Sequence, residues 1–300
     1  MEIRQLRHFV AVATHGSFTA AARAELIVQS ALSTSIRKLE RELGAELFER
    51  TGRRPVLTPA GLSLLPAARA LLADAEAAKD AVAAVTGLAA GRLVIGTIQT
   101  LTSVDLAAEL AAFQREQPGV QISVRDATVG ELLDGLLARE LDLAFVDLDG
   151  IEPPEGLAVY ATWEDELVLI TSPDHPLATA GHAYLSELGE ESFVDFREGT
   201  GVELAVRRRA ADCGLHRRIT CEVTQTDLLV ELVRSGLGIA IVPRRIGERH
   251  GLPCVTIRQP TPPRRVSLAG RAPVPRNPAA QAFLAHLAPA PDGTPDVTPS

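Results

Sequence analysis

The chain has 300 residues, 46% of them hydrophobic, which suffices for about two domains with real cores. No apolar run reaches the roughly 20 residues of a membrane span, and the first residues lack the pattern of a secretory signal, so we expect a cytoplasmic protein. The net charge of −8 by itself argues against binding to nucleic acid. Residues 1–66, however, hold nine basic and six acidic residues, a net charge of +3, so the remaining residues carry −11. A basic head on an acidic body allows one end of the chain to be drawn to DNA.

The first predicted elements are three helices. Residues 3–14 place Leu6, Phe9, Val10 and Ala13 on one helical face, and Ser17 is a good N-cap for a short alanine-rich helix from Phe18. Within residues 16–43, the last helix carries an apolar stripe and an opposite polar face. The stripe is Leu32, Ile36, Leu39 and Leu43, and the polar face is Gln29, Ser30, Ser33, Thr34, Arg37 and Arg41.

Such a polar face can lie in a major groove, with Gln29, Ser33 and Thr34 on base edges and Arg37 on a base or phosphate. An ordinary amphipathic helix with a solvated side is the alternative interpretation. Gly44 then ends the helix, and residues 47–50 and 55–58 form a hairpin whose tip holds Arg53 and Arg54 for the DNA backbone. Two short helices, a polar reading helix and a basic wing in this order favour a winged helix-turn-helix.

These residues also match a family, over about sixty residues. The segments that carry the match are Arg4-Gln5-Leu6, Gly16-Ser17-Phe18, Gln29-Ser30-Ala31-Leu32-Ser33, Ile36-Arg37-Lys38-Leu39-Glu40, Leu43-Gly44, Leu47-Phe48-Glu49-Arg50 and Leu57-Thr58-Pro59-Ala60-Gly61. The chain resembles LysR-type transcriptional regulators, and its length and layout fit that family. The turn before Gln29 departs from the family pattern: either Glu25 occupies the site of a core leucine, or Leu26 fills it and the turn is one residue shorter. The second arrangement costs less, because an unpaired buried carboxylate is unfavourable.

A long helix follows, opened by Thr58 as N-cap and Pro59 at the first helical position. An a/d stripe runs along it, formed by Leu64, Ala68, Leu71, Ala75, Ala78, Val82 and Val85. The stripe predicts pairing with a second copy, whereas packing against the chain's own domain is the alternative. In the resembled family this helix is the dimerisation linker. The small residues at 86–91 predict a hinge.

Strands and helices alternate from Arg92 on, which predicts parallel sheets covered by helices. A second round starts near Ala161, and residues 265–269 and 278–287 return to the first half, giving two α/β lobes with crossings near 161 and 264 and a cleft between them. The resemblance implies the periplasmic-binding-protein type II fold. We therefore expect a winged helix-turn-helix at 1–58, a linker helix and hinge at 59–90, an effector domain at 91–288 and a disordered tail at 289–300. Within the effector domain, the first lobe is expected at about 91–161 with 265–288, and the second lobe at about 162–264.

Polar side chains gather where predicted strands end. Parallel sheets place ligands at such ends, beside helix N-termini that favour anions. The candidate effector-binding residues are Gln99, Thr100, Thr102, Ser103, Thr128, Arg197, Thr200, Gly201 and Thr224. For Thr100, Ser103 and Thr226 the alternative is that they only cap helices. The set suits a small carboxylate or another polar metabolite.

Catalytic and metal-binding patterns are missing from the sequence: it has no G-x-S-x-G, H-E-x-x-H, P-loop or G-x-G-x-x-G signature. Cys213 and Cys221 invite comparison with the peroxide-sensing branch of the resembled family, but their positions favour buried, unlinked thiols. We therefore expect neither an enzyme nor a cofactor.

The first hypothesis is a dimeric or tetrameric, sequence-specific regulator of double-stranded DNA whose binding responds to a small-molecule effector in the acidic domain. A solute-binding protein or an enzyme on the same two-lobed fold is the alternative.

Overall fold

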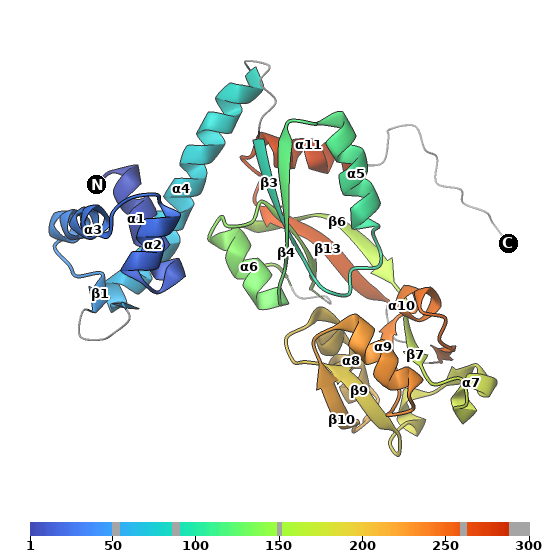
Figure 1. The fold of residues 1–300 in the computed structure, drawn as a ribbon. Coiled ribbons are helices and arrows are strands. Elements are labelled where there is room, and N and C mark those ends of the chain that lie inside the picture. Colours follow the sequence, from blue (N-terminus) through green and yellow to red (C-terminus); the bar gives the residue numbers. More distant parts are fainter. Residues whose placement is uncertain (50–54, 86–90, 149–151, 259–262, 288–300) are drawn as a thin grey trace. The chain divides into compact units, whose positions relative to one another are not determined.

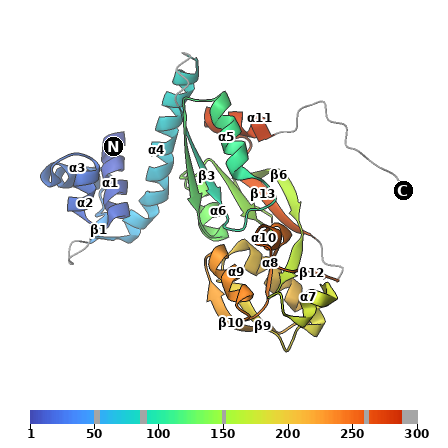
Figure 2. The same ribbon diagram turned by 45° about the vertical axis from the view of Figure 1, so that its right-hand side comes forward.

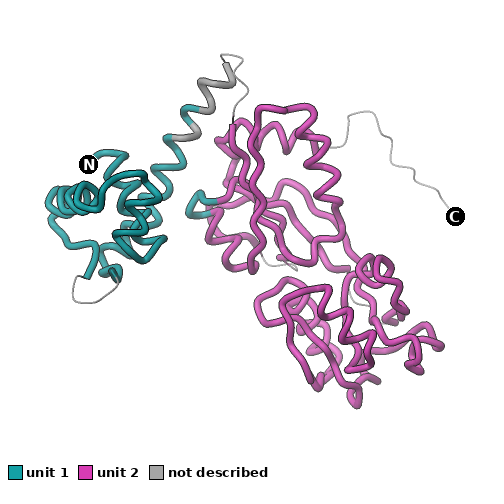
Figure 3. Tube along the Cα trace, in the orientation of Figure 1, with its two compact units in different colours: residues 1–88, 137–140 teal, residues 89–136, 141–300 magenta. Residues whose placement is uncertain are grey.

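The computed structural model describes residues 1–49, 55–85, 91–148, 152–258 and 263–287. The chain divides into two compact units, one formed by Met1–Leu88 with Leu137–Glu140 and the other by Ala89–Leu136 with Leu141–Ser300 (Figure 3). The expected tail at 289–300, the hinge before Gly91 and the arginines Arg53 and Arg54 lie outside the described residues. None of the described helices combines the length and the apolar character needed to cross a membrane.

The first unit begins with a head of three helices, which a short hairpin and a long helix follow (Figure 1). Its elements are α1 (Ile3–His15), α2 (Phe18–Ala24), α3 (Gln29–Leu43), β1 (Phe48–Glu49), β2 (Val56–Leu57) and α4 (Pro59–Val85). Ser17 caps α2 as expected, its hydroxyl accepting a hydrogen bond from the Ala20 N–H at 3.3 Å. Gly44 ends α3 with φ of 67°, a conformation that glycine adopts without strain. The side chains at the centre of the head's core are Leu6, Phe9, Val12, Leu32, Ile36, Leu39 and Phe48.

The turn between α2 and α3 differs from both arrangements expected from the sequence. Leu26 is 92% exposed and takes a left-handed conformation with φ of 55°. Its place against the core is taken by Ile27, whose N–H donates to the Ala22 carbonyl at 3.0 Å. Neither Glu25 nor Leu26 fills the core position, because the left-handed residue turns the chain and brings Ile27 inward.

Leu26→Gly should stabilise the head by about 0.5–1 kcal/mol. The left-handed conformation costs a leucine roughly 1–2 kcal/mol, and part of this gain is offset because glycine loses more backbone entropy on folding. Hydrogen exchange of the α1–α3 amides in the intact chain measures the change. Val28→Gly is the matched control: Val28 is also exposed, but its φ of −76° gives glycine no advantage, so this variant should be destabilised. Equal losses in both variants would contradict strain at Leu26.

The carboxyl end of α3 also differs from expectation, because Leu43 is 42% exposed and does not extend the apolar stripe. The buried position near this end is held by Glu40, whose carboxylate accepts the Leu47 N–H at 3.0 Å. This hydrogen bond compensates the burial of a charge and ties the end of the helix to the segment that enters the hairpin. Each strand of that hairpin is only two residues long.

Helix α4 starts as predicted, with the Thr58 hydroxyl accepting the Gly61 N–H at 3.0 Å. The beginning of its expected dimer stripe, however, belongs to the head: Leu64 packs on the head's core and Ala68 is fully buried in it. For these two residues the alternative, packing within the chain, is correct. Leu71 and Ala78 are exposed and remain candidates for pairing, whereas the side chains of Val82 and Val85 lie outside the described set.

A five-stranded sheet with order β4-β3-β5-β13-β6 forms the first lobe of the second unit. Strands β3 and β4 pair in parallel, as do β3 and β5, whereas β13 runs antiparallel to both β5 and β6. Helix α11 packs against α5 and β3, as Figures 1 and 2 show. The elements are β3 (Gly91–Thr97), α5 (Leu106–Glu116), β4 (Val120–Asp126), α6 (Val129–Leu137), β5 (Leu143–Asp147), β6 (Leu157–Asp165), β13 (Arg264–Arg271) and α11 (Pro278–Leu287).

The second lobe, residues 167–257, has its own core around β7, β9 and β11. Strand β7 pairs antiparallel with β11 and β12, and β9 pairs parallel with β10. The elements are β7 (Leu167–Ile170), α7 (Pro176–Ala180), β8 (His182–Ala183), the 3₁₀ turn Leu185–Glu187, β9 (Ser192–Phe196), α8 (Gly201–Asp212), β10 (Arg218–Val223), α9 (Thr226–Arg234), β11 (Ala240–Pro243), α10 (Arg244–Arg249) and β12 (Cys254–Ile257).

The five-stranded sheet and the four-stranded sheet β11-β7-β12-β8 are mixed, whereas β9 and β10 form a separate parallel pair. The expectation of parallel sheets is therefore correct only in part. A chain that crosses from one lobe to the other enters the new lobe at the carboxyl ends of the strands that are already there. Its first strand therefore runs antiparallel to those strands, as β13 does beside β5. The first crossing also comes later than expected, because β6 stays in the first lobe until Asp165. Strands β6, β8 and β12 were not predicted from the sequence.

Candidate functional site

The polar face of α3 is open to solvent. Gln29, Ser30, Thr34 and Arg37 are exposed and Ser33 is half-buried. The Thr34 hydroxyl donates to the Ser30 carbonyl at 2.8 Å, which uses its proton and leaves its oxygen able to accept. Arg41 donates from Nε to the Arg37 carbonyl at 3.3 Å, so it is directed along the helix. The two wing arginines of the candidate set, Arg53 and Arg54, lie in the segment without a described structure.

A cavity of about 360 Å³ in the second unit brings together most of the candidate effector-binding residues. It is lined from the first lobe by the segment after β3 and the start of α6, and from the second lobe by the start of α8 and the end of β10. Thr102 and Ser103 are not part of its lining. The candidates that do line it are Gln99, Thr100, Thr128, Arg197, Thr200, Gly201 and Thr224.

Thr100 and Thr102 have structural partners. Thr100 is 2% exposed, and its hydroxyl accepts from Arg264 Nη2 at 3.0 Å while its carbonyl accepts from Nη1 at 3.1 Å. The Thr102 hydroxyl donates to Asp165 Oδ2 at 2.7 Å, and its carbonyl accepts from Arg245 Nη1 at 2.8 Å. Both hydroxyls therefore already have a structural partner. Thr100 borders the cavity, and because its hydroxyl only accepts from Arg264, its own proton stays unused among the described residues.

Arg264 is the centre of a buried ionic cluster at the lobe crossings. Its side chain is 0% exposed, and Nε lies 2.5 Å from Asp147 Oδ2 while Nη1 lies 3.3 Å from Asp165 Oδ2. Burial raises the pKa of the Asp165 carboxyl, against the opposing effects of Thr102, Arg264 and Arg245. The cluster joins the end of β5, the end of β6, the start of β13 and the 98–102 segment, so it fixes the floor of the cleft.

Two other threonines of the set, Thr128 and Thr200, lie at helix starts and cap them. Thr128 and Glu131 form a reciprocal pair at the start of α6, with the Thr128 hydroxyl donating to Oε2 at 2.7 Å. Thr200 caps α8 by accepting the Glu203 N–H at 3.4 Å. Ser103 caps nothing, because α5 begins at Leu106 with Asp105 as its cap, and within the described structure the Ser103 hydroxyl is buried without a hydrogen-bond partner.

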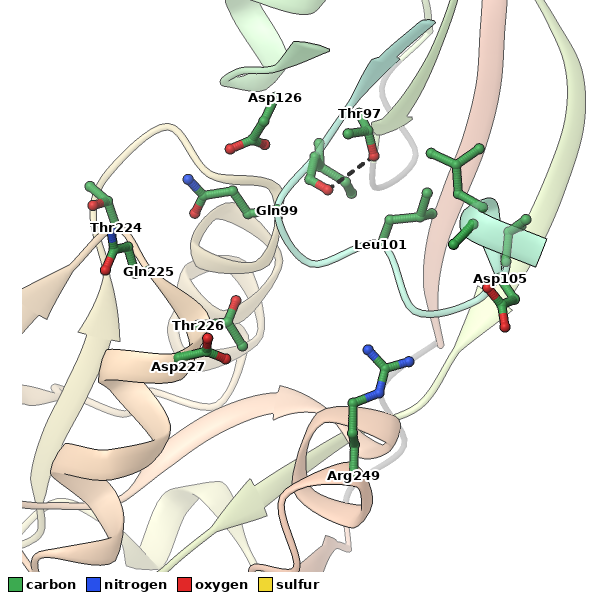
Figure 4. A pocket seen from close by; sticks show the side chains of 14 residues that line it. Thr97, Gln99, Leu101, Asp105, Asp126, Thr224, Gln225, Thr226, Asp227 and Arg249 are labelled. Atoms are coloured by element: carbon green, nitrogen blue, oxygen red, sulfur yellow. Dashed lines mark hydrogen bonds between the residues drawn. The ribbon is translucent and has the colours of Figure 1, made fainter. Parts of the chain in front are cut away.

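A second cavity, of about 670 Å³, adjoins the first (Figure 4). Ile98, Gln99, Asp126 and Thr224 line both cavities, so they form a shared wall. The second cavity adds the start of α9 and Arg249, the last residue of α10. Asp126 ends β4, so the rule that placed the other candidates at strand ends could have found it. No local signal marks Arg249, which reaches the cleft only through the packing of α10.

The described residues contain no group of three His, Cys, Asp or Glu side chains suited to a metal ion. The three cysteines are free and half-buried. The two units thus contain a helical head with an open polar face and a two-lobed body with a polar cleft. Together they define a class: a helix-turn-helix protein with a ligand-binding domain.

Comparisons with known proteins identify the family. Residues 3–62 match the bacterial regulatory helix-turn-helix protein family of lysR type, and residues 86–291 match the LysR substrate binding domain. The chain belongs to the LysR family of bacterial transcriptional regulators.

Individual relatives agree with this assignment. The RuBisCO operon transcriptional regulator of Allochromatium vinosum is 34% identical over 245 residues, which cover 81% of this chain and 79% of the relative. A probable hydrogen peroxide-inducible genes activator of Mycobacterium avium is 31% identical over 280 residues, 90% of this chain and 88% of the relative. The structure of full-length CbnR in complex with its target DNA has a TM-score of 0.68 and 26% identity, covering 95% of this chain and 98% of CbnR. These relatives are regulators and not enzymes, so the regulator hypothesis is favoured over its alternative.

Proposed function

We propose that α3 reads a DNA sequence, with Gln29, Ser33 and Thr34 on base edges, Ser30 beside them and Arg37 on a base or phosphate. The observation that carries this proposal is the exposure of the polar face of α3 at the end of a rigid, well-packed head. Among the described residues no carboxylate pairs with the Arg37 guanidinium, which leaves it free for a phosphate or a guanine edge. Arg53 and Arg54 would neutralise phosphates and add a salt-dependent, sequence-independent attraction.

The cleft of the second unit is proposed to bind a small polar effector, carrying a carboxylate or a related group. Gln99, Thr128, Arg197, Thr200 and Thr224 bring donors and acceptors to the wall of the 360 Å³ cavity. An effector that binds one arrangement of the lobes more tightly shifts the population toward it, and thereby changes how the heads meet DNA.

The regulator is proposed to act in the cytoplasm as a dimer or a tetramer. A reader of two half-sites needs paired heads spaced about 34 Å or a multiple apart. The exposed Leu71 and Ala78 on α4 supply part of a pairing surface. The division into a head at 1–58, a linker at 59–90 and an effector domain at 91–288 is proposed on the same basis.

Replacing Gln29 by alanine should lower the free-energy difference between the preferred and the other bases at one position of the DNA site by about 1–3 kcal/mol, because a bidentate amide contact is lost. Arg53→Ala should weaken binding to all sequences alike and lower the salt slope by about one. Both are measured by titrating a DNA site selected from a random-sequence pool, together with its single-base variants, at several salt concentrations. Gln121→Ala, an exposed glutamine on β4 of the other unit, is the matched control and should leave binding unchanged. If both variants lost sequence choice equally, the proposed division of roles would be wrong.

A further inference from the structure

The cleft holds two cavities that share a wall, and each cavity has one arginine that the other lacks. The two cavities, of about 360 and 670 Å³, share the wall of Ile98, Gln99, Asp126 and Thr224. Arg197 lines the first cavity alone and Arg249 the second alone. In Figure 4 the Arg249 side chain extends toward the segment that carries Leu101, and the Gln99 side chain of the same segment lies below Asp126.

Both arginines are available to a ligand. Arg197 and Arg249 are exposed, and no hydrogen bond or ion pair engages either guanidinium within the described parts of the chain. A guanidinium in a polar groove binds carboxylate or phosphate through two parallel hydrogen bonds. Each cavity therefore suits one anionic group.

Most of the acidic side chains around the two cavities are already engaged. Glu198 accepts from Arg207 at 2.9 Å, and Glu131 accepts from Thr128 at 2.7 Å. Asp105 caps α5 through the Ala108 N–H at 3.1 Å. Asp227 is exposed and lies 3.8 Å from His250 Nε2, which is an ion pair only when the imidazole is protonated. Asp126, in the shared wall, has no such contact with another described residue. The shared wall therefore offers a carboxylate acceptor that a ligand can meet with a hydrogen-bond donor such as a hydroxyl or an amine.

We infer that the effector is a small metabolite with an anionic group at each end and hydrogen-bond donors between them. This inference rests on the proposed function of the cleft and narrows its ligand class. One anionic end would meet Arg197 and the other Arg249, while a central hydroxyl or amine would donate to Asp126. A monoanion of the same length leaves one arginine unused, so it should bind about tenfold more weakly, the value of one charge-assisted hydrogen bond.

The test uses matched probes with the intact chain, titrated by calorimetry. Glucarate has two carboxylates and a hydroxylated middle, gluconate has one carboxylate, and adipate has two carboxylates without hydroxyls. Fructose 1,6-bisphosphate, with two phosphate groups, and fructose 6-phosphate, with one, form the corresponding phosphate pair. Each phosphate carries nearly two charges at neutral pH, so the term dianion here counts anionic groups and not charges. We expect at least one probe with two anionic groups to bind about tenfold more tightly than its partner with one, and the carboxylate and phosphate pairs separate the two sources of charge.

The variants locate the binding. Arg197→Gln and Arg249→Gln should each abolish the preference for the dianion, and Asp126→Asn should reduce the preference for glucarate over adipate. Arg115→Gln, at an exposed arginine of α5 outside both cavities, is the matched control and should change nothing. The inference is overturned if neither dianion exceeds its partner, or if both cleft arginine variants keep the preference.

Failure of the ligand class and failure of the proposed function give different results. If sequence-specific DNA binding is found but no dianion is preferred, the proposed regulator function is supported and the proposed ligand class is wrong. If dianions bind through both arginines but no DNA sequence is preferred, the proposed function is wrong and the ligand class is supported.

Discussion

Arg264→Ala should lower the free energy of unfolding of the second unit by about 3–5 kcal/mol, the usual result of removing one partner from a buried ion pair. The Arg264 side chain is fully buried and donates to Asp147, Asp165 and both oxygens of Thr100. Its removal leaves two buried carboxylates without their common cation. Because these partners come from three segments and Arg264 from a fourth, the loss should loosen the floor of the cleft and not only one strand.

The chain carries its own probe for this measurement. Its only tryptophan, Trp163, lies on β6 with its ring centroid 5.7 Å from that of Phe145, inside the first lobe of the second unit. Urea unfolding followed by its fluorescence therefore reports on the lobe that holds Arg264.

Arg265→Ala is the neighbouring control: Arg265 is more than half exposed and lies 3.8 Å from Glu164, so its removal should cost less than about 1 kcal/mol. In a double variant, Asp165→Asn should recover part of the loss in Arg264→Ala. Equal midpoints for the Arg264 and Arg265 variants would show that the cluster does not hold the lobe together.

Gly201→Ala should destabilise the second unit by about 1–3 kcal/mol and weaken its response to cleft ligands. A Cβ atom at residue 201 would lie 2.5 Å from the Cβ of Asp147, which is too close for any real contact. Asp147 ends β5 in the first lobe and Gly201 begins α8 in the second, so the added methyl group must push the lobes apart at this point. The missing side chain of Gly201 thus permits the approach of the lobes.

The measurement is the rise in melting temperature produced by a saturating dianion in the parent chain and the variant. We expect a smaller rise in Gly201→Ala than in the parent. Gly130→Ala is the matched control, because Gly130 lies within α6 with open space around its Cβ position. This substitution should be neutral or stabilise by up to about 1 kcal/mol. A variant at Gly201 that behaves like the control would contradict a tight lobe contact.

The head could be predicted from the sequence because its signals are local. Ser17 and Thr58 act as caps within three residues of their partners, Gly44 ends α3, and the three-and-four spacing of Leu32, Ile36 and Leu39 buries one side of the helix. The wrong details came from competition between neighbours. Ile27, and not Leu26, packs against the core. Leu43 is exposed at the end of α3, where the hydrogen-bonded Glu40 is buried instead.

The cleft could be located but not resolved in detail. The rule of strand ends brought Gln99, Thr128, Arg197 and Thr224 to one cavity, as expected for α/β lobes. The roles of Thr100 and Thr102 could not be foreseen, because their partners Arg264 and Asp165 are 164 and 63 residues away in the chain. Distant pairing of this kind leaves no periodicity in the sequence.

The position of β13 has a consequence for synthesis on the ribosome. Strand β13 lies between β5 and β6 in the sheet, yet the whole second lobe separates it from them in the chain. While the second lobe is being translated, the nascent first lobe has an open slot between two strands whose backbone groups lack partners. The second lobe can complete its own core before that slot is filled, so folding of the body should proceed from the inserted lobe outward, with the enclosing lobe closing last. Until then the gap exposes strand edges that other nascent chains could pair with, which makes this interval the one in which a chaperone would matter most.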